Sequence, residues 1–116
     1  MLNAVDNNEH EAIVSIISIA ELYVGFYKAN ESRERNIFIN GLYSNQQYKI
    51  LNIDLYIADK SAEIKNETHL RLPDALITAS FVMEKCDCLI TNDPHFTKAN
   101  IYIPVYSVKA FCENFL

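Results

Sequence analysis

The chain has 116 residues, half of them apolar and 22% charged, which is the balance of one globular domain with a single buried core. Fifteen acidic and ten basic residues give a net charge of −5, which argues against a nucleic-acid binder that relies on a broad basic surface. The longest apolar run, residues 12–20, is interrupted by Ser15 and Ser18, so we expect no membrane span.

The start of the chain and its cysteines favour a cytoplasmic protein. No basic residue leads into an apolar segment at the start, so we expect no signal peptide. Cys86, Cys88 and Cys112 are odd in number and lack the spacing of a zinc ribbon. We therefore expect reduced thiols in the core.

Strands and helices are predicted to alternate along the chain. Residues 13–18 are mostly β-branched and uncharged, which is typical of a short buried strand. Apolar residues from Ile19 to Tyr27 then recur at helical spacing. Further on we expect helices over 31–47, 54–69 and 72–85, strands over 50–53, 88–91 and 104–108, and a short terminal helix. This alternation predicts parallel strand pairing in a layered α/β sheet.

The apolar residues of each helix predict which face is buried. Asp54 should cap the helix over 54–69, and Pro73 occupies a favoured first position in the next helix. That next helix is apolar nearly all round, so we expect it to be central. In the other two helices the expected buried residues are Ile37, Phe38, Gly41 and Leu42, and Leu55, Ala58 and Ala62.

Three acids are expected where predicted strands end. Glu21 falls in the first turn after the strand over 13–18, Asp74 at the start of the buried helix, and Asp93 directly after the strand over 88–91. Ligands of parallel α/β sheets bind beyond the carboxyl ends of the strands. Two carboxylates ~4 Å apart repel each other by about 4 kcal/mol at an effective dielectric constant of ~20, so a shared site needs a cation.

Oxygen-only ligands favour Mg²⁺ or Mn²⁺ at such a site, and two divalent ions would bring the net charge from −5 to −1. Each acid also has a simpler interpretation when taken alone. Glu21 could be a solvated helix acid, Asp74 a helix-start residue and Asp93 a turn residue before proline. Their joint spacing favours one shared site.

Three segments resemble the motifs of PIN domains, in the order that the family has them. Residues 18–25 (SIAELYVG) are similar to the family's S-x-x-E-L-x-x-G segment, and residues 72–79 (LPDALITA) to its P-D-x-L-I-A-A helix. Residues 89–96 (LITNDPHF) are similar to its L-x-T-x-D-x-x-F turn. The resemblance covers residues 13–108 and implies a three-layer α/β/α fold with a mainly parallel sheet. The nearest subgroup is the VapC-like toxins.

The resemblance implies a metal-dependent endoribonuclease of a toxin–antitoxin pair. Glu21, Asp74 and Asp93 match the acids that hold Mg²⁺ or Mn²⁺ in the family and carry the catalysis. Thr91 or Asn92 would hydrogen-bond a ligand carboxylate or a metal-bound water. The implied partners are RNA, a cognate antitoxin protein and a second copy of the chain in a homodimer.

The sequence departs from the family pattern at its start. PIN domains begin with a strand that ends in a metal-binding Asp, and residues 2–12 look instead like the helix that leads into the second family strand. We therefore interpret residues 1–116 as one PIN-like domain that is truncated at its N-terminus. In the family the missing strand lies between those matching 13–18 and 88–91, so both should lose a pairing partner.

Two other functions remain open from the sequence. The alternative is a catalytically impaired PIN-like module that acts through protein–protein contacts. A flavodoxin-like receiver or nucleotide-binding domain lacks support because no glycine-rich phosphate loop follows a strand. The stripe of Tyr23, Phe26 and Tyr27 could be core or interface. Basic residues that could line an RNA path, or simply be exposed charges, are Lys28, Arg33, Arg35, Lys49 and Arg71.

Overall fold

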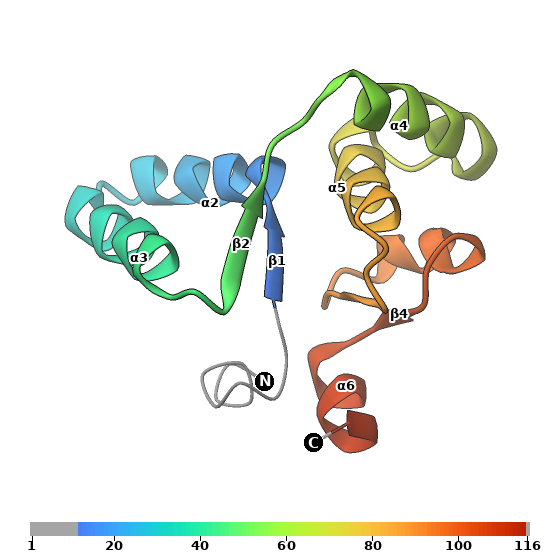
Figure 1. Cartoon of the computed structure of the whole chain (residues 1–116). Helices are drawn as coiled ribbons and strands as arrows, with labels where there is room; N and C mark the ends of the chain where they lie inside the picture. The colour runs from blue at the N-terminus through green and yellow to red at the C-terminus, as the bar shows by residue number, and fades with distance from the viewer. Residues whose placement is uncertain (1–11, 116) are drawn as a thin grey trace. The chain divides into compact units, whose positions relative to one another are not determined.

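The computed structural model describes residues 12–115 (Figure 1). The helix expected within residues 2–12 therefore lies outside the described residues, except for Ala12. The chain forms two compact units, residues 2–52 and 53–116, and each is described by itself. Within the described part, no helix is long and apolar enough to cross a membrane.

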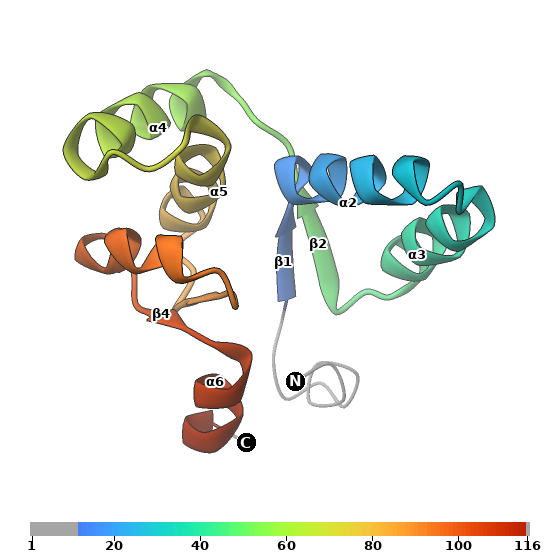
Figure 2. The same ribbon diagram turned by 180° about the vertical axis from the view of Figure 1, so that it is seen from behind.

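Helices and short parallel strands make up both units (Figures 1 and 2). β1 pairs with β2 and β3 pairs with β4, both in parallel, so the described strands form two two-stranded sheets. This confirms the predicted α/β class with parallel strands. In chain order the elements are β1 (Ala12–Ser15), α2 (Ile16–Lys28), α3 (Ser32–Ser44), β2 (Tyr48–Leu51), α4 (Leu55–Thr68), α5 (Leu72–Met83), β3 (Leu89–Ile90), the 3-10 helix η1 (Pro94–Ile101), β4 (Val105–Tyr106) and α6 (Val108–Phe115).

In the unit of residues 2–52, the strand ends three residues earlier than predicted. The Ser15 hydroxyl accepts a hydrogen bond from the Ile17 backbone N–H at 3.1 Å and caps α2. Serine is a favoured N-cap because its oxygen satisfies one of the N–H groups that the first turn leaves unpaired. The helix therefore begins at Ile16, and residues 16–18 belong to α2 rather than to the strand.

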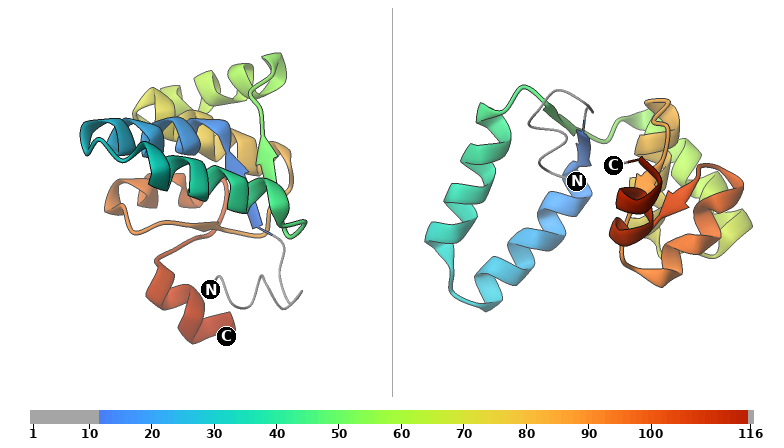
Figure 3. Two further views of the ribbon diagram at one scale, coloured as in Figure 1. Left: turned by 90° about the vertical axis from the view of Figure 1, so that its left-hand side faces the viewer. Right: turned by 90° about the horizontal axis from the view of Figure 1, so that it is seen from below.

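The helices α2 and α3 form a hairpin (Figure 3). The rings of Phe26 and Phe38 lie 6.1 Å apart, and the Arg35 guanidinium lies over the rings of Tyr23 and Tyr27. The expected burial of the helix over 31–47 is wrong, because α3 has no buried residue and Ile37 is 60% exposed. The aromatic stripe thus packs against α3 without forming a closed core.

The core of the unit of residues 53–116 lies between α4 and α5. Ile57 and Ile64 of α4 are buried in one cluster with Ala75 and Ala79 of α5, whose small side chains allow the two helices to pack closely. The predicted face of α4 is wrong, because Leu55 is 83% exposed and Ala58 and Ala62 are exposed too. Its buried residues are Ile57, Ser61, Ile64 and Thr68, one stripe at helical spacing.

The helix α5 is as central as its composition predicts. Six of its twelve residues are buried, including Asp74, and Pro73 stands in its first turn. The predicted cap of α4 is also confirmed, because an Asp54 carboxylate oxygen accepts the Ile57 backbone N–H at 2.8 Å. The best-buried helix within residues 12–115 therefore carries one of the three candidate acids.

The corrected face of α4 can be tested with two substitutions on one helix. Ile64→Ala should lower the free energy of unfolding by about 3 kcal/mol, because it opens a cavity in the α4–α5 core. Leu55→Ala, at the exposed start of α4, should change it by less than ~0.5 kcal/mol. Urea unfolding measures both values, and equal losses would contradict the observed face.

Candidate metal-binding acids

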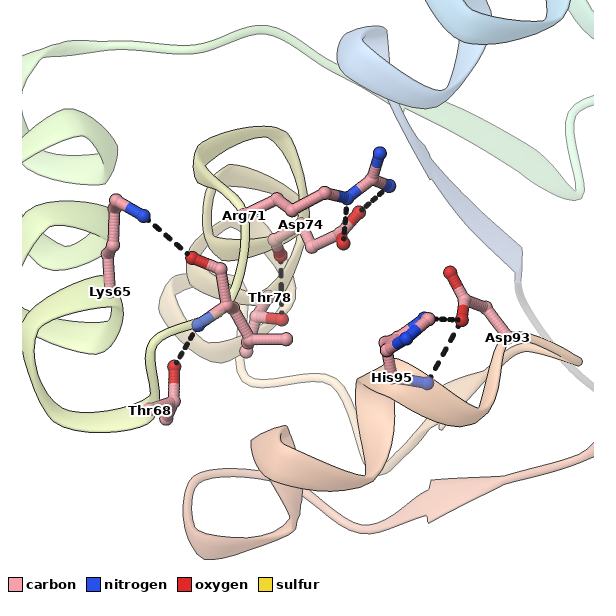
Figure 4. Close-up of polar contacts among 8 residues, drawn as sticks. Lys65, Thr68, Arg71, Asp74, Thr78, Asp93 and His95 are labelled. Carbon is pink, nitrogen blue, oxygen red and sulfur yellow. Dashed lines mark hydrogen bonds and ion pairs between the residues drawn. The ribbon is translucent and has the colours of Figure 1, made fainter.

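A tightly bonded turn between α4 and α5 sets the position of the first acid. The Thr68 hydroxyl donates to the Ile64 carbonyl at 2.7 Å and accepts the Leu70 backbone N–H at 3.2 Å. The Lys65 ammonium donates to the Leu70 carbonyl at 3.0 Å, and the Leu70 side chain is buried in the core (Figure 4). His69 adopts the left-handed conformation that ends α4. These contacts fix the backbone position of Arg71 and the start of α5.

Asp74 lies in the first turn of α5 with its side chain only 2% exposed. Both of its carboxylate oxygens are held by Arg71, whose Nε donates to Oδ2 at 3.0 Å and whose Nη2 donates to Oδ1 at 3.1 Å. Such a two-pronged contact is the strongest geometry for this pair of groups. The Arg71 side chain itself is 66% exposed, so the guanidinium covers the carboxylate from the solvent side.

Asp93 follows β3 and caps η1, as its place after the predicted strand implies. Its Oδ1 accepts the His95 backbone N–H at 2.9 Å and lies 3.0 Å from His95 Nδ1. The pKa of the Asp93 carboxyl is lowered, first by the backbone hydrogen bond from His95 and then by the hydrogen bond and charge of the imidazole. Desolvation, the second-largest effect, raises the pKa without reversing the shift, and the charge of Arg71 makes the smallest lowering contribution.

Arg71 therefore interacts with both candidate acids of this unit, Asp74 and Asp93. It binds Asp74 directly, and its positive charge also acts on Asp93 (Figure 4). Among residues 12–115, no three His, Cys, Asp or Glu side chains lie close enough together to hold a metal ion as they stand. Instead, the guanidinium of Arg71 supplies the positive charge that binds Asp74 and acts on Asp93.

Glu21 lies in the other unit, on α2, and its side chain is exposed. We expected it in the first turn of its helix, and this is wrong: α2 begins at Ile16, so Glu21 is the sixth residue and lies in the second turn. The early start follows from the Ser15 cap described above. Asp74 and Asp93 thus belong to the unit of residues 53–116, and Glu21 belongs to the unit of residues 2–52.

Thr91 and Asn92 shape the loop that carries Asp93. The Thr91 hydroxyl accepts the Asp93 backbone N–H at 3.1 Å, and the Asn92 amide oxygen accepts the Val108 backbone N–H at 3.1 Å. Thr91 thereby orients the backbone of the acid, while Asn92 ties its loop to the start of α6. Neither side chain contacts the Asp74 carboxylate in the hydrogen bonds described.

The donor chemistry of this unit fits a hard divalent cation. Asp74 and Asp93 offer carboxylate oxygens only, the type of ligand that Mg²⁺ and Mn²⁺ prefer. A buried carboxylate is costly unless a positive charge compensates it, and at Asp74 the guanidinium fills this role. A metal ion bound to the same oxygens would lie beside the guanidinium of Arg71.

The parallel strands, the connecting helices and the acids at the ends of two elements define an α/β protein with an acidic candidate site. The chain belongs to the PIN domain family, whose model matches residues 2–101. It is also similar to a chain of a toxin–antitoxin complex from Klebsiella pneumoniae, with 28% sequence identity and a TM-score of 0.58. That match covers 72% of this chain and 65% of the other. No curated protein matches the chain.

Two residues of the site were not singled out by the sequence. Arg71 is only one of five basic residues that the sequence offers for an RNA path, and His95 is not among the candidate site residues. A cation three residues before an acid at a helix start predicts an ion pair, and this spacing could have identified Arg71. The contact of His95 with Asp93 has a weaker indication, the Asp-Pro-His turn.

The pKa of Asp93 gives a test of this geometry. Because the pKa is lower in the folded than in the unfolded chain, the acid stabilises the fold above its unfolded pKa, and this contribution is lost as the pH falls through the folded pKa. In His95→Ala the folded pKa should rise toward its usual value without reaching it, because the backbone N–H of residue 95 still donates.

Carboxyl ¹³C NMR titration measures the pKa of Asp93 in both proteins. Thr97→Ala, on the same 3-10 helix, removes a hydroxyl that bonds only the Pro94 carbonyl and should leave the titration unchanged. An unchanged midpoint in His95→Ala would contradict the described role of the imidazole.

Proposed function

We propose that the protein is a metal-dependent endoribonuclease toxin of the VapC-like type, inhibited by a cognate antitoxin. The observation that carries the proposal is a buried carboxylate, Asp74, that requires a cation and shares a unit with Asp93 in a PIN domain. The similarity to a chain of a toxin–antitoxin complex supports the assignment to this kind of pair. Mg²⁺ or Mn²⁺ is the proposed cofactor and RNA the proposed substrate.

Glu21, Asp74 and Asp93 are proposed to hold the metal and to form the catalytic group. When bound, the ion would lower the pKa of a water molecule and stabilise charge on the phosphodiester. Asp74 contributes a carboxylate on the best-buried helix, so its position changes little. Asp93 contributes a carboxylate whose pKa is lowered, chiefly by the backbone hydrogen bond from His95. Thr91 holds the backbone of that acid in place.

A second function, the catalytically impaired PIN-like module, is favoured by one specific observation. Both oxygens of Asp74 are engaged by Arg71, and no three-residue metal group forms within residues 12–115. If the ion pair never opens, the chain would retain the fold and act through protein contacts. Metal-dependent cleavage separates the two functions.

The nuclease proposal predicts RNA cleavage that requires all three acids. Labelled single-stranded RNA should be cut in Mg²⁺ or Mn²⁺, and EDTA should abolish the reaction. Glu21→Gln, Asp74→Asn and Asp93→Asn should each slow it by about 100-fold or more, because each removes a charged ligand.

Asp59→Asn is the matched control, since it removes the same charge from an exposed position on α4. Its cleavage rate should equal that of the wild type. Cleavage by the wild type that none of the three substitutions reduces would refute the assigned acids. No metal-dependent cleavage at all would favour the impaired module.

We further propose that the chain forms a homodimer through the hairpin of α2 and α3. The apolar side chains of Leu22, Val24 and Ile37 are about half or more exposed there, which leaves an apolar surface without a covering element among the described residues. Surfaces of this kind mark contact sites in soluble proteins. The cognate antitoxin is the other proposed protein partner.

Light scattering should give a mass near twice 13.3 kDa for the wild type. Val24→Asp should shift the mass toward that of a single chain, because it puts a charge into the proposed interface. Leu55→Asp, at a more exposed apolar position on α4, should leave the mass unchanged. A single-chain mass for the wild type would refute the homodimer.

A further inference from the structure

The ion pair of Arg71 and Asp74 occupies the place where the proposed function needs a metal ion. Each carboxylate oxygen of Asp74 accepts one N–H of the guanidinium, at 3.0 and 3.1 Å. A divalent cation would need at least one of these oxygens at about 2.1 Å. Two cations so close to one carboxylate repel each other strongly, so the pair and the metal compete for Asp74.

The position of Arg71 is unusual for a residue that only stabilises the helix. It stands immediately before α5, where the helix dipole favours negative groups, and its side chain makes no capping hydrogen bond. Its head group is bound by the carboxylate three residues later. The α4–α5 turn, with Thr68, Lys65 and buried Leu70, fixes the backbone from which Arg71 reaches over the acid (Figure 4).

Arg71 can also leave without disturbing the core. Its side chain is 66% exposed, whereas Asp74 is 2% exposed on a helix with six buried residues. Rotation of a solvated side chain requires no change in packing, but movement of Asp74 would. The mobile partner of the pair is therefore the cation, and the carboxylate stays where a replacement cation would find it.

Resting on the proposed function, we propose that Arg71 is a built-in counter-ion that competes with the divalent metal for Asp74 and must swing away when the metal binds. In the metal-free protein it compensates the buried charge. On metal binding it is released, with its guanidinium free to contact an anionic group such as an RNA phosphate. The measured metal affinity is then lower than the acids alone would give, by the fraction of molecules in which the pair is open.

The test compares Mn²⁺ binding by the purified full chain and by Arg71→Met, with electron paramagnetic resonance as the readout of free Mn²⁺. Methionine keeps an unbranched aliphatic side chain and removes both the charge and the paired N–H donors of the guanidinium. We expect Arg71→Met to bind Mn²⁺ on the order of tenfold more tightly than the wild type. Arg33→Met is the matched control: it deletes the same charge from an exposed position on α3 and should shift the affinity much less.

A second measurement uses the wild type alone and so does not depend on a variant that folds. The Arg71 Nε–H resonance should shift on titration with Mg²⁺, with the same midpoint as the Asp74 backbone amide. A resonance that stays unchanged while the Asp74 amide responds would overturn the proposal. Equal Mn²⁺ affinities of the wild type and Arg71→Met, or an equal gain in Arg33→Met, would overturn it too.

The outcomes distinguish this inference from the function on which it rests. Mn²⁺ binding by the wild type that Arg71→Met does not alter refutes the competition and leaves the metal-dependent nuclease intact. No Mn²⁺ binding by either protein refutes both.

Discussion

The packing of α4 on α5 is the constraint on which the candidate site depends. Ile57 and Ile64 pack with the small residues Ala75 and Ala79, and this contact places the start of α5, with Asp74, inside the protein. A carboxylate that is buried this way must have a compensating cation or lose its charge. Helix packing therefore creates the electrostatic requirement that Arg71 meets in the metal-free chain.

The same requirement connects the fold to the proposed chemistry. A metal site built from acids alone would repel itself when empty, and this would oppose folding. An arginine that binds one of the acids compensates its charge. The structural role of Arg71 and its proposed competition with a metal ion are thus two consequences of one contact. A PIN domain that is stable without its ion is the expected result.

Much of this architecture was predictable because its causes are local. Asp54 and Pro73 mark helix starts, the apolar composition of α5 predicts its burial, and alternation predicts parallel pairing. The failures concern tertiary context. Apolar periodicity alone does not decide whether Leu55 or Ile57 is the buried residue of α4. It also predicts more burial for α3 than the structure shows. The sequence also predicts the positions of Asp74 at a helix start and of Asp93 after a strand. The two hydrogen bonds from Arg71 to Asp74 depend instead on how the α4–α5 turn is bonded.

The exposure of α3 has a consequence for local stability. Amide exchange and proteolysis report opening that does not require the whole protein to unfold, and helices with few buried contacts open first. α3 has no buried residue and is held to α2 by the Phe26–Phe38 contact and by the stacking of Arg35. Its amides should therefore exchange well before those of α5. The α3 arm of the hairpin can therefore be reshaped at a low free-energy cost.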